Sequence, residues 1–328
     1  MKKILVIGAG SIGERHIRCL QLTKRADVSV CEANDSLRQQ IAERYGLTAD
    51  FASLNEALSQ PFDGAVVCTP AHLHVPMAQQ LAEAGSSILI EKPLSTSLDG
   101  IDPLKSVVQK GTISAGVAYV LRHHPALQKL KQLLQTGSYG PPVQVVYTGG
   151  QHFPFYRPAY REIYYTRHET GGGAIQDALT HVVNASEWLV GPVTRLVADA
   201  EHCVLDGVTV EDTVHLITRH HAVLGSFSLN QHQPPNESTL TVVCEQGALR
   251  FEMHQNRCLT CQEPNAAWVV AEAFELERDD LFVRQASAFI DQLEQQTEPS
   301  CSIAEAEQTL RVNLAALESV RTGTWIQL

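Results

Sequence analysis

A short apolar run followed by three spaced glycines constrains the fold of this chain more than any other feature. Residues 4–7 are apolar, and Gly8, Gly10 and Gly13 follow them in the G-x-G-x-x-G spacing. In this spacing the first glycine permits a tight strand-to-helix turn, the second lets a pyrophosphate approach the backbone, and the third lets the helix pack against the strand. The helix then presents free N–H groups and the positive end of its dipole to the phosphates. The sequence therefore predicts a dinucleotide-binding turn.

An acidic residue follows this turn at the distance that a ribose contact requires. The apolar run 28–31 ends in Glu32, which lies 19 residues after Gly13. A carboxylate there accepts hydrogen bonds from the adenosine ribose and repels a 2′-phosphate, for which NADP sites use Arg instead. No basic residue occurs between Glu32 and Arg38. We therefore expect NAD in preference to NADP.

Composition narrows the class of protein. The 328 residues suffice for two domains, and 44% hydrophobic with 19% charged residues is typical of a globular enzyme. A net charge of −11 without a basic cluster argues against nucleic acid or an anionic membrane as partner. No apolar run approaches the roughly 20 residues that span a bilayer, and the four apolar residues before Gly8 are too few for a signal peptide. We expect a cytoplasmic protein.

The eight cysteines are scattered along the chain. Most lie in apolar patterns, where reduced Cys behaves as a small hydrophobic residue. Cys258 and Cys261 form a C-x-x-C that lacks a second Cys or His pair at zinc spacing. We interpret them as strand residues near a turn and expect no metal site, with a redox or metal role as the alternative.

The first 121 residues alternate strand-like and helix-like segments. Such alternation indicates parallel βαβ units with helices on both faces of the sheet. We therefore predict an N-terminal Rossmann domain with a doubly wound parallel sheet at 1–121. The predicted strands are 3–7, 27–32, 63–68, 86–90 and 113–117, and the predicted helices are 11–22, 35–45, 72–84 and 97–109.

Residues 122–328 follow a different pattern and are predicted to form a second α/β domain. A helix at 125–136, a strand at 143–149 and a helix from Gly171 to Gly191 are followed by strand-like runs without helices between them. Such runs pair as a large open sheet that is mostly antiparallel. The strand-like runs are 193–204, 212–219, 223–231, 238–244 and 248–252. Terminal helices are expected at about 281–296 and 303–321, and whether they pack back on the first domain stays open.

Four motifs, in this order along the chain, resemble the Gfo/Idh/MocA oxidoreductases, which include glucose–fructose oxidoreductases and inositol dehydrogenases. The resemblance implies NAD(P) at the carboxyl edge of the Rossmann strands and substrate between the nicotinamide and the second sheet. It also implies a homodimer or homotetramer built through the open face of that sheet. The motifs are Gly8-Ala-Gly-Ser-Ile-Gly13, Cys68-Thr69-Pro70-Ala-His-Leu-His74, Glu91-Lys92-Pro93 and Gly171-Gly172-Gly173 with Asp177-Ala-Leu-Thr-His181.

The resemblance implies that Lys92, Asp177 and His181 form the catalytic set, and the chemistry of these residues agrees. Lys92 follows a strand at the sheet edge that lines the ligand crevice. Asp177 and His181 are four residues apart, about one turn on one helix face. A neutral His accepts a hydroxyl proton near neutral pH. Asp177 would orient and charge-stabilise it, and Lys92 would stabilise alkoxide character.

The segment 152–170 is predicted to recognise the substrate. It is rich in aromatic rings, which stack on sugars, and in Arg, which binds carboxylates. Parts of it resemble a branch of the family that acts on nonulosonic or other acidic sugars. A role as an inter-subunit arm is the alternative, because Tyr and Arg also favour interfaces. Its residues of these types are Phe153, Phe155, Tyr156, Arg157, Tyr160, Arg161, Tyr164, Tyr165 and Arg167.

These observations predict an NAD-dependent dehydrogenase acting on a sugar, an acidic sugar or a cyclic polyol. An NAD-dependent glycosidase or lyase that oxidises its sugar transiently, and a non-catalytic NAD sensor, are the alternatives. His74 is either a cofactor-side contact or a capping or core histidine. The predicted cofactor contacts are Gly8, Gly10, Ser11, Ile12, Gly13, Glu32, Cys68, Thr69, Pro70, His74, Glu91 and Lys92. The predicted substrate contacts are Lys92, Tyr119, Tyr156, Arg157, Tyr160, Arg161, Asp177 and His181.

Overall fold

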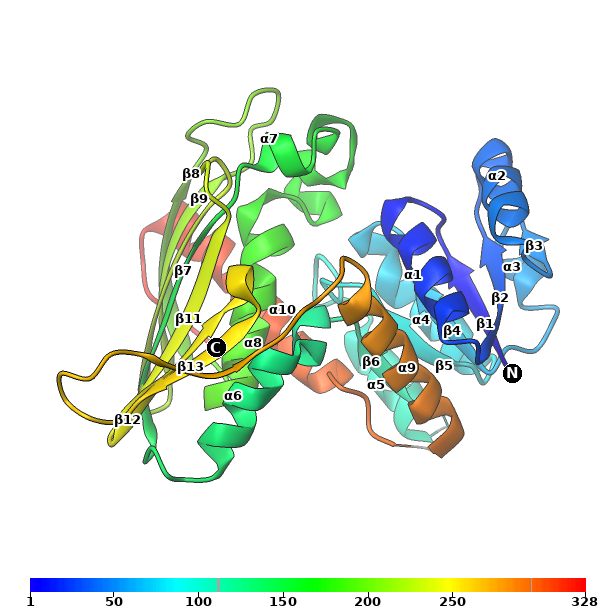
Figure 1. Cartoon of the computed structure of the whole chain (residues 1–328). Helices are drawn as coiled ribbons and strands as arrows, with labels where there is room; N and C mark the ends of the chain where they lie inside the picture. Colours follow the sequence, from blue (N-terminus) through cyan, green and yellow to red (C-terminus); the bar gives the residue numbers. More distant parts are fainter. Residues whose placement is uncertain (111–112, 296) are drawn as a thin grey trace. The chain divides into compact units, whose positions relative to one another are not determined.

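The computed structural model of the protein describes residues 1–110, 113–295 and 297–328. The chain divides into two compact units (Figure 1). The first contains Met1–Val120 and Glu277–Glu307, and the second contains Leu121–Leu276 and Gln308–Leu328. The division at Val120 lies one residue before the end of the first predicted domain. The predicted helix at 281–296 falls in the first unit, except for residue 296, which lies outside the described residues.

A six-stranded parallel sheet forms the centre of the first unit, in the order β3-β2-β1-β4-β5-β6. Strand β1 pairs with β2 on one side and β4 on the other, so the chain order reverses at β1. In open sheets of this kind, ligands bind at the carboxyl ends of the strands where the order reverses. The strands are β1 (Lys2–Ile7), β2 (Ala26–Cys31), β3 (Asp50–Phe51), β4 (Gly64–Val67), β5 (Ser87–Ile90) and β6 (Ala115–Val117).

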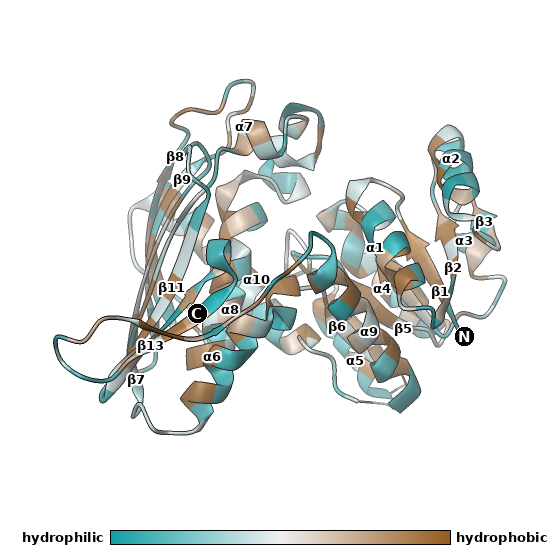
Figure 2. Cartoon of the chain, viewed as in Figure 1, coloured by the Kyte–Doolittle hydropathy of each residue, from teal (hydrophilic) through white to brown (hydrophobic). Residues whose placement is uncertain are grey.

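Helices cover the parallel sheet, whose apolar strands are largely buried (Figure 2). The C-terminal helix α9 packs on α1, where Phe289 and Ile290 join Ile17 and Leu20 in one apolar cluster. Helix α9 therefore belongs to the core of the first unit. The helices of this unit are α1 (Ser11–Leu22), α2 (Asp35–Tyr45), α3 (Leu54–Ala57), α4 (His74–Glu83), α5 (Ile101–Lys110), α9 (Asp280–Gln295) and the start of α10 (Ile303–Thr322).

A nine-stranded sheet forms the second unit, in the order β14-β13-β12-β11-β7-β10-β9-β8-β15. Its neighbouring strands pair antiparallel except β7 and β10, which are parallel. The predicted fold class is therefore confirmed. The strands are β7 (Pro142–Gly150), β8 (Arg195–Glu201), β9 (Thr213–His220), β10 (Val223–Asn230), β11 (Glu237–Cys244), β12 (Gly247–Glu252), β13 (Arg257–Cys261), β14 (Val269–Ala273) and β15 (Ile326–Gln327).

One face of this sheet is covered by α6 (Pro125–Gln135), α8 (Thr180–Val190) and the later part of α10 (Figure 1). Side chains from these helices and the strands form one large apolar cluster. Along β9 and β10, buried residues alternate with more exposed ones that point to the opposite face. Two apolar residues on that face, Ile217 and Leu224, are 48% and 42% exposed. The period-two pattern of these strands thus leaves one face open.

Several elements differ from the sequence prediction. Strands β3 and β15 are only two residues long, which is too short for a periodic pattern. Every residue of β14 is exposed, so it shows no alternation of apolar and polar residues. Helix α5 begins at Ile101 rather than residue 97, because Ser97 and Asp99 bond each other in a turn before it.

Candidate active site

The predicted glycine turn joins β1 to α1 with close backbone contacts. Gly8 has a φ of +89°, a left-handed conformation that favours glycine. A Cβ on Gly13 would lie 1.9 Å from the Gly8 carbonyl oxygen, so α1 packs against the strand end only because Gly13 has no side chain. A Cβ on Gly10 would meet no atom of the described residues within 4 Å. The Cβ position of Gly10, at the N-terminus of α1, is thus open, as the close approach of a pyrophosphate to this backbone would require.

The N-terminus of α1 has backbone N–H groups that no side-chain cap of the described residues satisfies. Gly10 is the N-cap, and no side chain caps the helix there. Ser11 is exposed and Ile12 half-buried in the first turn. The first N–H groups of a helix have no partner within the helix, so an anion at this end is stabilised by them. Ser11 and Ile12, which the sequence predicted as cofactor contacts, therefore lie in the turn that carries these N–H groups.

Glu32 lies just beyond the end of β2 and is held against the glycine turn. Its Oε2 accepts a hydrogen bond from the Ala9 N–H at 2.8 Å, and its Oε1 accepts one from the Asn34 N–H at 2.9 Å. The carboxylate is therefore fixed in place before any ribose arrives. A 2′-phosphate at this position would meet a negative charge.

The nearest base after Glu32 is already engaged. Arg38 forms ion pairs with Asp35 at 2.7 Å and with Asp50 at 2.9 Å, and it donates to the Glu32 carbonyl oxygen at 2.9 Å. The Arg38 side chain is only 12% exposed. Arg38 is thus held by two carboxylates, which supports the preference for NAD that the sequence predicted.

Residues 68–70 follow β4, so they lie at the carboxyl ends of the strands, as the glycine turn does. Cys68 is buried, its N–H donates to the Ile7 carbonyl oxygen at 2.7 Å, and burial raises the pKa of its thiol well above the usual range. Cys68 therefore packs as an uncharged side chain beneath the turn. Thr69 is half-buried and Pro70 is exposed, so these two offer surface at the edge.

Lys92 follows β5 at this edge between two buried residues. Glu91 and Pro93 are buried, and Lys92 itself is half-buried. The Lys92 N–H donates to the neighbouring Glu91 carboxylate at 3.1 Å. Tyr119, a predicted substrate contact, is 1% exposed, and this burial argues against a direct contact between its ring and a ligand.

His74 is a core residue. It is 1% exposed, and its two ring nitrogens lie 2.9 Å from the Pro93 carbonyl oxygen and 2.8 Å from the Thr69 carbonyl oxygen. Burial lowers the pKa of His74. Of the alternatives that the sequence left open, this geometry favours the core histidine.

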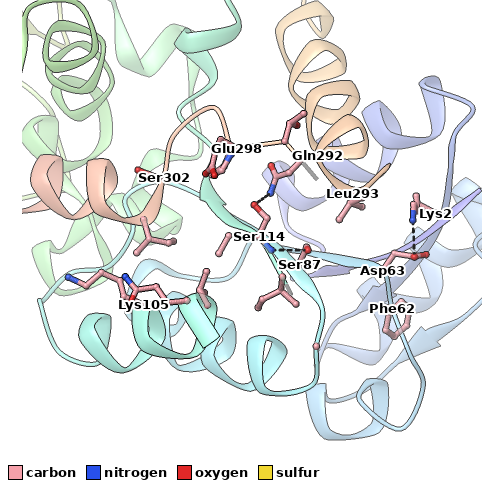
Figure 3. A pocket seen from close by; sticks show the side chains of 18 of the residues that line it. Lys2, Phe62, Asp63, Ser87, Lys105, Ser114, Gln292, Leu293, Glu298 and Ser302 are labelled. Atoms are coloured by element: carbon pink, nitrogen blue, oxygen red, sulfur yellow. Dashed lines mark hydrogen bonds and ion pairs between the residues drawn. The ribbon is translucent and has the colours of Figure 1, made fainter. Parts of the chain in front are cut away.

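The first unit also contains a cavity of about 940 Å³, which does not lie at the carboxyl ends of the parallel strands. Its lining residues Lys2, Ser87 and Ala115 begin β1, β5 and β6, so it lies at the amino ends of the strands. Figure 3 shows the Lys2–Asp63 ion pair and the Gln292–Ser114 hydrogen bond among its side chains. The glycine turn, Thr69 and Lys92 lie at the opposite edge.

In the second unit, Asp177 and His181 lie on consecutive helical segments. Asp177 is in a π-helical turn, η6 (Ile175–Leu179), and His181 is the second residue of α8. The sequence predicted one regular helix here. Such wide turns inside helices are frequent at functional sites. Asp177 is 4% exposed and His181 is half-buried.

Tyr164 contacts a predicted catalytic residue, although no motif of the sequence assigns it an individual role. It lies in η4 (Tyr164–Thr166), and its hydroxyl donates to Asp177 Oδ1 at 2.7 Å. The sequence placed Tyr164 in the aromatic segment but could not distinguish it from five other rings. The signal that separates it is contact with a buried carboxylate, which only the tertiary structure shows.

A buried polar seam between α8 and α10 fixes the rotation of α8. Thr180, Asn184 and Glu187 form one stripe on α8, four and three residues apart. They bond Asn313, Thr309 and Gln308 of α10 at 2.9, 3.0 and 3.1 Å. Rotation of α8 would break these bonds, and a buried polar group that loses its partner, as at Thr180 or Asn184, costs about 1–3 kcal/mol. The seam therefore sets the direction in which His181 points.

Much of the predicted substrate segment is instead a small apolar core. Phe153, Tyr160 and Tyr165 are at most 3% exposed and pack with Leu205, Val208 and Val210. The Tyr160 hydroxyl donates to the Asp206 carbonyl oxygen at 2.7 Å. This placement argues against Tyr160 as a substrate contact.

The polar and exposed residues of the same segment divide into two groups. Arg161 donates to the Asp206 carbonyl oxygen at 2.8 Å, so its guanidinium joins the segment to the loop after β8, although the side chain is 50% exposed. Phe155, Tyr156 and Arg157 are exposed, with Phe155 at 75% and Tyr156 at 47%. All three side chains therefore reach the surface of the segment.

Glu211 supports the start of the helix that carries Asp177. Its Oε1 accepts from the Ile175 N–H at 2.9 Å, and its Oε2 pairs with His168 Nε2 at 2.6 Å. A Cβ on Gly173 would lie 2.6 Å from this carboxylate, so the glycine allows the close approach. The hydrogen bond to Glu211 raises the pKa of His168.

Within the described ranges, no group of three or more His, Cys, Asp or Glu side chains is arranged to hold a metal ion. Cys258 is buried on β13, and burial raises the pKa of its thiol to about 12. Also within these ranges, no helix combines the length and apolar character needed to cross a membrane.

Two family profiles match this architecture. The profile of the oxidoreductase family with an NAD-binding Rossmann fold matches residues 2–119, and the profile of the GFO/IDH/MocA C-terminal domain matches residues 127–250. The chain belongs to the Gfo/Idh/MocA oxidoreductase family. This confirms the resemblance seen in the sequence and, at the level of the family, the NAD cofactor.

Solved structures of similar fold include dehydrogenases. The WlbA dehydrogenase from Bordetella pertussis, in complex with NADH and UDP-GlcNAcA, has a TM-score of 0.85 and 25% identity, covering 100% of this chain and 98% of that one. A levoglucosan dehydrogenase in complex with NADH has a TM-score of 0.90 at 20% identity, covering 99% and 98%. The second likeness shows the fold alone.

Curated relatives match over shorter lengths. The levoglucosan dehydrogenase of Pseudarthrobacter phenanthrenivorans is 28% identical over 163 residues, which is 49% of this chain and 42% of the relative. The inositol 2-dehydrogenase/D-chiro-inositol 3-dehydrogenase of Shouchella clausii is 27% identical over 193 residues, 57% and 53% respectively. The chain thus spans about half the length of these relatives.

The two glycines of the turn predict different outcomes on substitution. Gly13→Ala places a methyl group 1.9 Å from the Gly8 carbonyl oxygen, so it should destabilise the protein by about 1–3 kcal/mol or more. Gly10→Ala meets no atom within 4 Å, so it should unfold in urea like the wild type while binding NADH more weakly. Urea unfolding and NADH fluorescence titration measure both. Unchanged NADH affinity in Gly10→Ala would contradict a pyrophosphate at this position.

Glu32→Gln should narrow the preference for NAD over NADP. It keeps an acceptor for the Ala9 N–H but removes the charge that repels a 2′-phosphate, a repulsion on the order of 1–4 kcal/mol between unit charges near a surface. The ratio of kcat/KM for the two cofactors should fall by about tenfold or more. Glu43→Gln is the control, because it removes the same charge at an exposed position of α2. An unchanged ratio in Glu32→Gln would count against Glu32 as the selector.

The His168–Glu211 pair predicts a pH-dependent contribution to stability. Because the folded pKa of His168 is raised, its stabilisation is complete below the unfolded pKa of about 6.5 and is lost as pH rises through the folded value. The difference in unfolding free energy between wild type and His168→Gln should therefore be larger at about pH 6 than at about pH 9. Urea unfolding at both values tests this, with exposed His215→Gln as control. Equal differences at both pH values would contradict it.

Proposed function

We propose that this protein is an NAD-dependent dehydrogenase that transfers a hydride between the nicotinamide and a hydroxyl-bearing carbon of a sugar, an acidic sugar or a cyclic polyol. The observation that supports it best is the buried Asp177, bonded by Tyr164 and one turn before His181. A protein that only binds NAD needs no such proton-handling pair. The family, the glycine turn and the position of Lys92 after β5 agree with this proposal.

In the proposed reaction each residue has one task. His181 accepts the hydroxyl proton, because neutral imidazole is a base near neutral pH. Asp177, held by the Tyr164 hydroxyl, stabilises the imidazolium that forms. Lys92 stabilises the developing alkoxide as a cation. NAD, when bound, supplies the hydride acceptor.

The proposed substrate class combines the relatives with the exposed residues of segment 152–170. Relatives are named as levoglucosan and inositol dehydrogenases, and one similar structure contains UDP-GlcNAcA. Tyr156 and Arg157 are exposed and of the types that stack on sugar rings and pair with carboxylates. A screen of sugars, uronates and inositols that follows NADH absorbance tests the class. Substrate loss without stoichiometric NADH would indicate the glycosidase or lyase alternative.

His181→Ala should lower kcat by about 10²–10⁴-fold, the usual cost of removing a general base. NADH binding should persist, because the glycine turn is unchanged. Lys92→Ala should lower kcat and also raise the KM for substrate. Steady-state kinetics beside NADH titration separate these effects, and His221→Ala, at an exposed position in the turn between β9 and β10, is the control. A wild-type kcat in His181→Ala would remove His181 from the mechanism.

We also propose that the protein is a homodimer or homotetramer that assembles through the open face of the nine-stranded sheet. Ile217 is 48% exposed there and pairs directly with Val197 of β8. Ile217→Lys should reduce the molar mass measured by light scattering after size exclusion. Leu22→Lys, at a 56% exposed position on α1, is the control. An unchanged mass in Ile217→Lys would argue for an interface elsewhere.

A further inference from the structure

Lys92 lies between two residues that are each held by a buried histidine of the first unit. His16 contacts Glu91, which precedes Lys92, and His74 contacts Pro93, which follows it. Neither histidine is on the segment that carries Lys92: His16 is on α1 and His74 begins α4. Both are 1% exposed, so neither offers surface to a ligand.

The contact before Lys92 is a short bond between two buried side chains. His16 Nε2 lies 2.6 Å from Glu91 Oε1, and Glu91 is 6% exposed. The second carboxylate oxygen, Oε2, accepts from the Lys92 N–H at 3.1 Å. The Glu91 carboxylate therefore joins α1 to the backbone of Lys92 through one group.

The contact after Lys92 joins two neighbouring loops. His74 Nδ1 lies 2.9 Å from the Pro93 carbonyl oxygen, and His74 Nε2 lies 2.8 Å from the Thr69 carbonyl oxygen. The two loops follow β4 and β5, which are paired with Val67 opposite Ile90. Carbonyl oxygens only accept hydrogen bonds, and a neutral imidazole has one N–H, so the ring donates to one of the two carbonyl oxygens and packs against the other. His74 therefore fixes the loop of Lys92 relative to the loop after β4.

We propose that His16 and His74 are positioning residues that together hold Lys92 at the carboxyl edge of the parallel sheet. The inference rests on the proposed function, because it assigns these histidines to the placement of Lys92 in that reaction. His16 follows Gly13 by three residues on α1, so the same helix that offers its N-terminus to the cofactor also holds the Lys92 segment. The lysine and the phosphate-binding turn thereby keep a fixed separation.

The consequence for catalysis follows from geometry. A misplacement of about 1 Å in a catalytic group can cost on the order of 10²-fold in rate. Loss of either histidine contact frees one side of the Lys92 backbone without removing its ammonium group. The effect should therefore fall on kcat more than on the binding of NADH, which uses the glycine turn.

The variants are chosen to separate positioning from folding. His74→Leu and His16→Leu remove the contacts and keep an apolar volume in the core. His74→Gln retains one N–H donor and is the conservative rescue. His220→Leu is the matched control, because His220 is also 1% exposed and bonds a backbone carbonyl, Gly191 O, at 2.7 Å in the second unit.

One readout does not depend on activity. Reductive methylation with ¹³C-formaldehyde gives each lysine an NMR signal, and Lys92→Arg identifies the signal of Lys92. We expect His74→Leu and His16→Leu to shift or broaden this signal and to lower kcat by about 10–100-fold. The Kd for NADH should stay near the wild-type value. His74→Gln should recover part of both changes, and His220→Leu should change only thermal stability.

The outcomes distinguish the positioning role of His16 and His74 from the catalytic role proposed for Lys92. A wild-type Lys92 signal in both leucine variants overturns the positioning role, whatever the activity. A wild-type kcat in Lys92→Ala overturns the proposed function of Lys92, while the NMR signal still decides whether the histidines hold it. If the leucine variants do not fold, Glu91→Gln, which keeps the side-chain shape, is used with the same signal. An unchanged signal there overturns the proposal as well.

Discussion

The close packing of α1 on the end of β1 is the constraint on which the first unit depends. A side chain at Gly13 would overlap the Gly8 carbonyl oxygen at 1.9 Å, so the helix reaches this position only with glycine. That approach places the free N–H groups of α1 beside open space at Gly10. It also brings His16 within 2.6 Å of Glu91, which connects the turn to the segment of Lys92. The close approach at Gly13 therefore positions both the N-terminus of α1 and the segment that carries Lys92 at the carboxyl ends of the strands.

In the second unit, hydrogen bonds to carboxylates help to fix the helical stretch that carries Asp177. Asp177 and Glu187 are carboxylates near opposite ends of one helical stretch, and each is held by neutral donors. Tyr164 bonds Asp177, and Thr309 and Gln308 bond Glu187. Buried polar groups that lose their partners are costly, so these bonds favour one rotation of the helix over others.

The aromatic residues of segment 152–170 divide into a buried group that forms a core and an exposed group at the surface. Its aromatic residues suggested a surface for sugars, yet Phe153, Tyr160 and Tyr165 form a core with 205–210. A long segment outside the main sheet needs its own buried cluster to be ordered, because its backbone entropy must be offset. The exposed residues of the segment include Tyr156 and Arg157, which support the proposed recognition of substrate.

The sequence by itself determined the parallel sheet, the glycine turn and the family, because each is encoded by local spacing. Strand and helix periods and the positions of Gly8, Gly10 and Gly13 are visible in short windows of the chain. It also gave the candidate residues Glu32, Lys92, Asp177 and His181, because each lies in a recognisable motif. Short or fully exposed strands such as β3 and β14 were missed, since they carry no periodic signal.

Only the tertiary structure decided which side chains meet. The bonds of Tyr164 to Asp177, of His16 to Glu91 and of Arg38 to Asp50 join residues that lie 13, 75 and 12 positions apart. No local pattern reports such contacts, because they depend on how separate elements pack. The same packing divides the aromatic rings of 152–170 into buried and exposed ones. Burial and partnership are properties of the folded chain, and they decide what chemistry each predicted residue can perform.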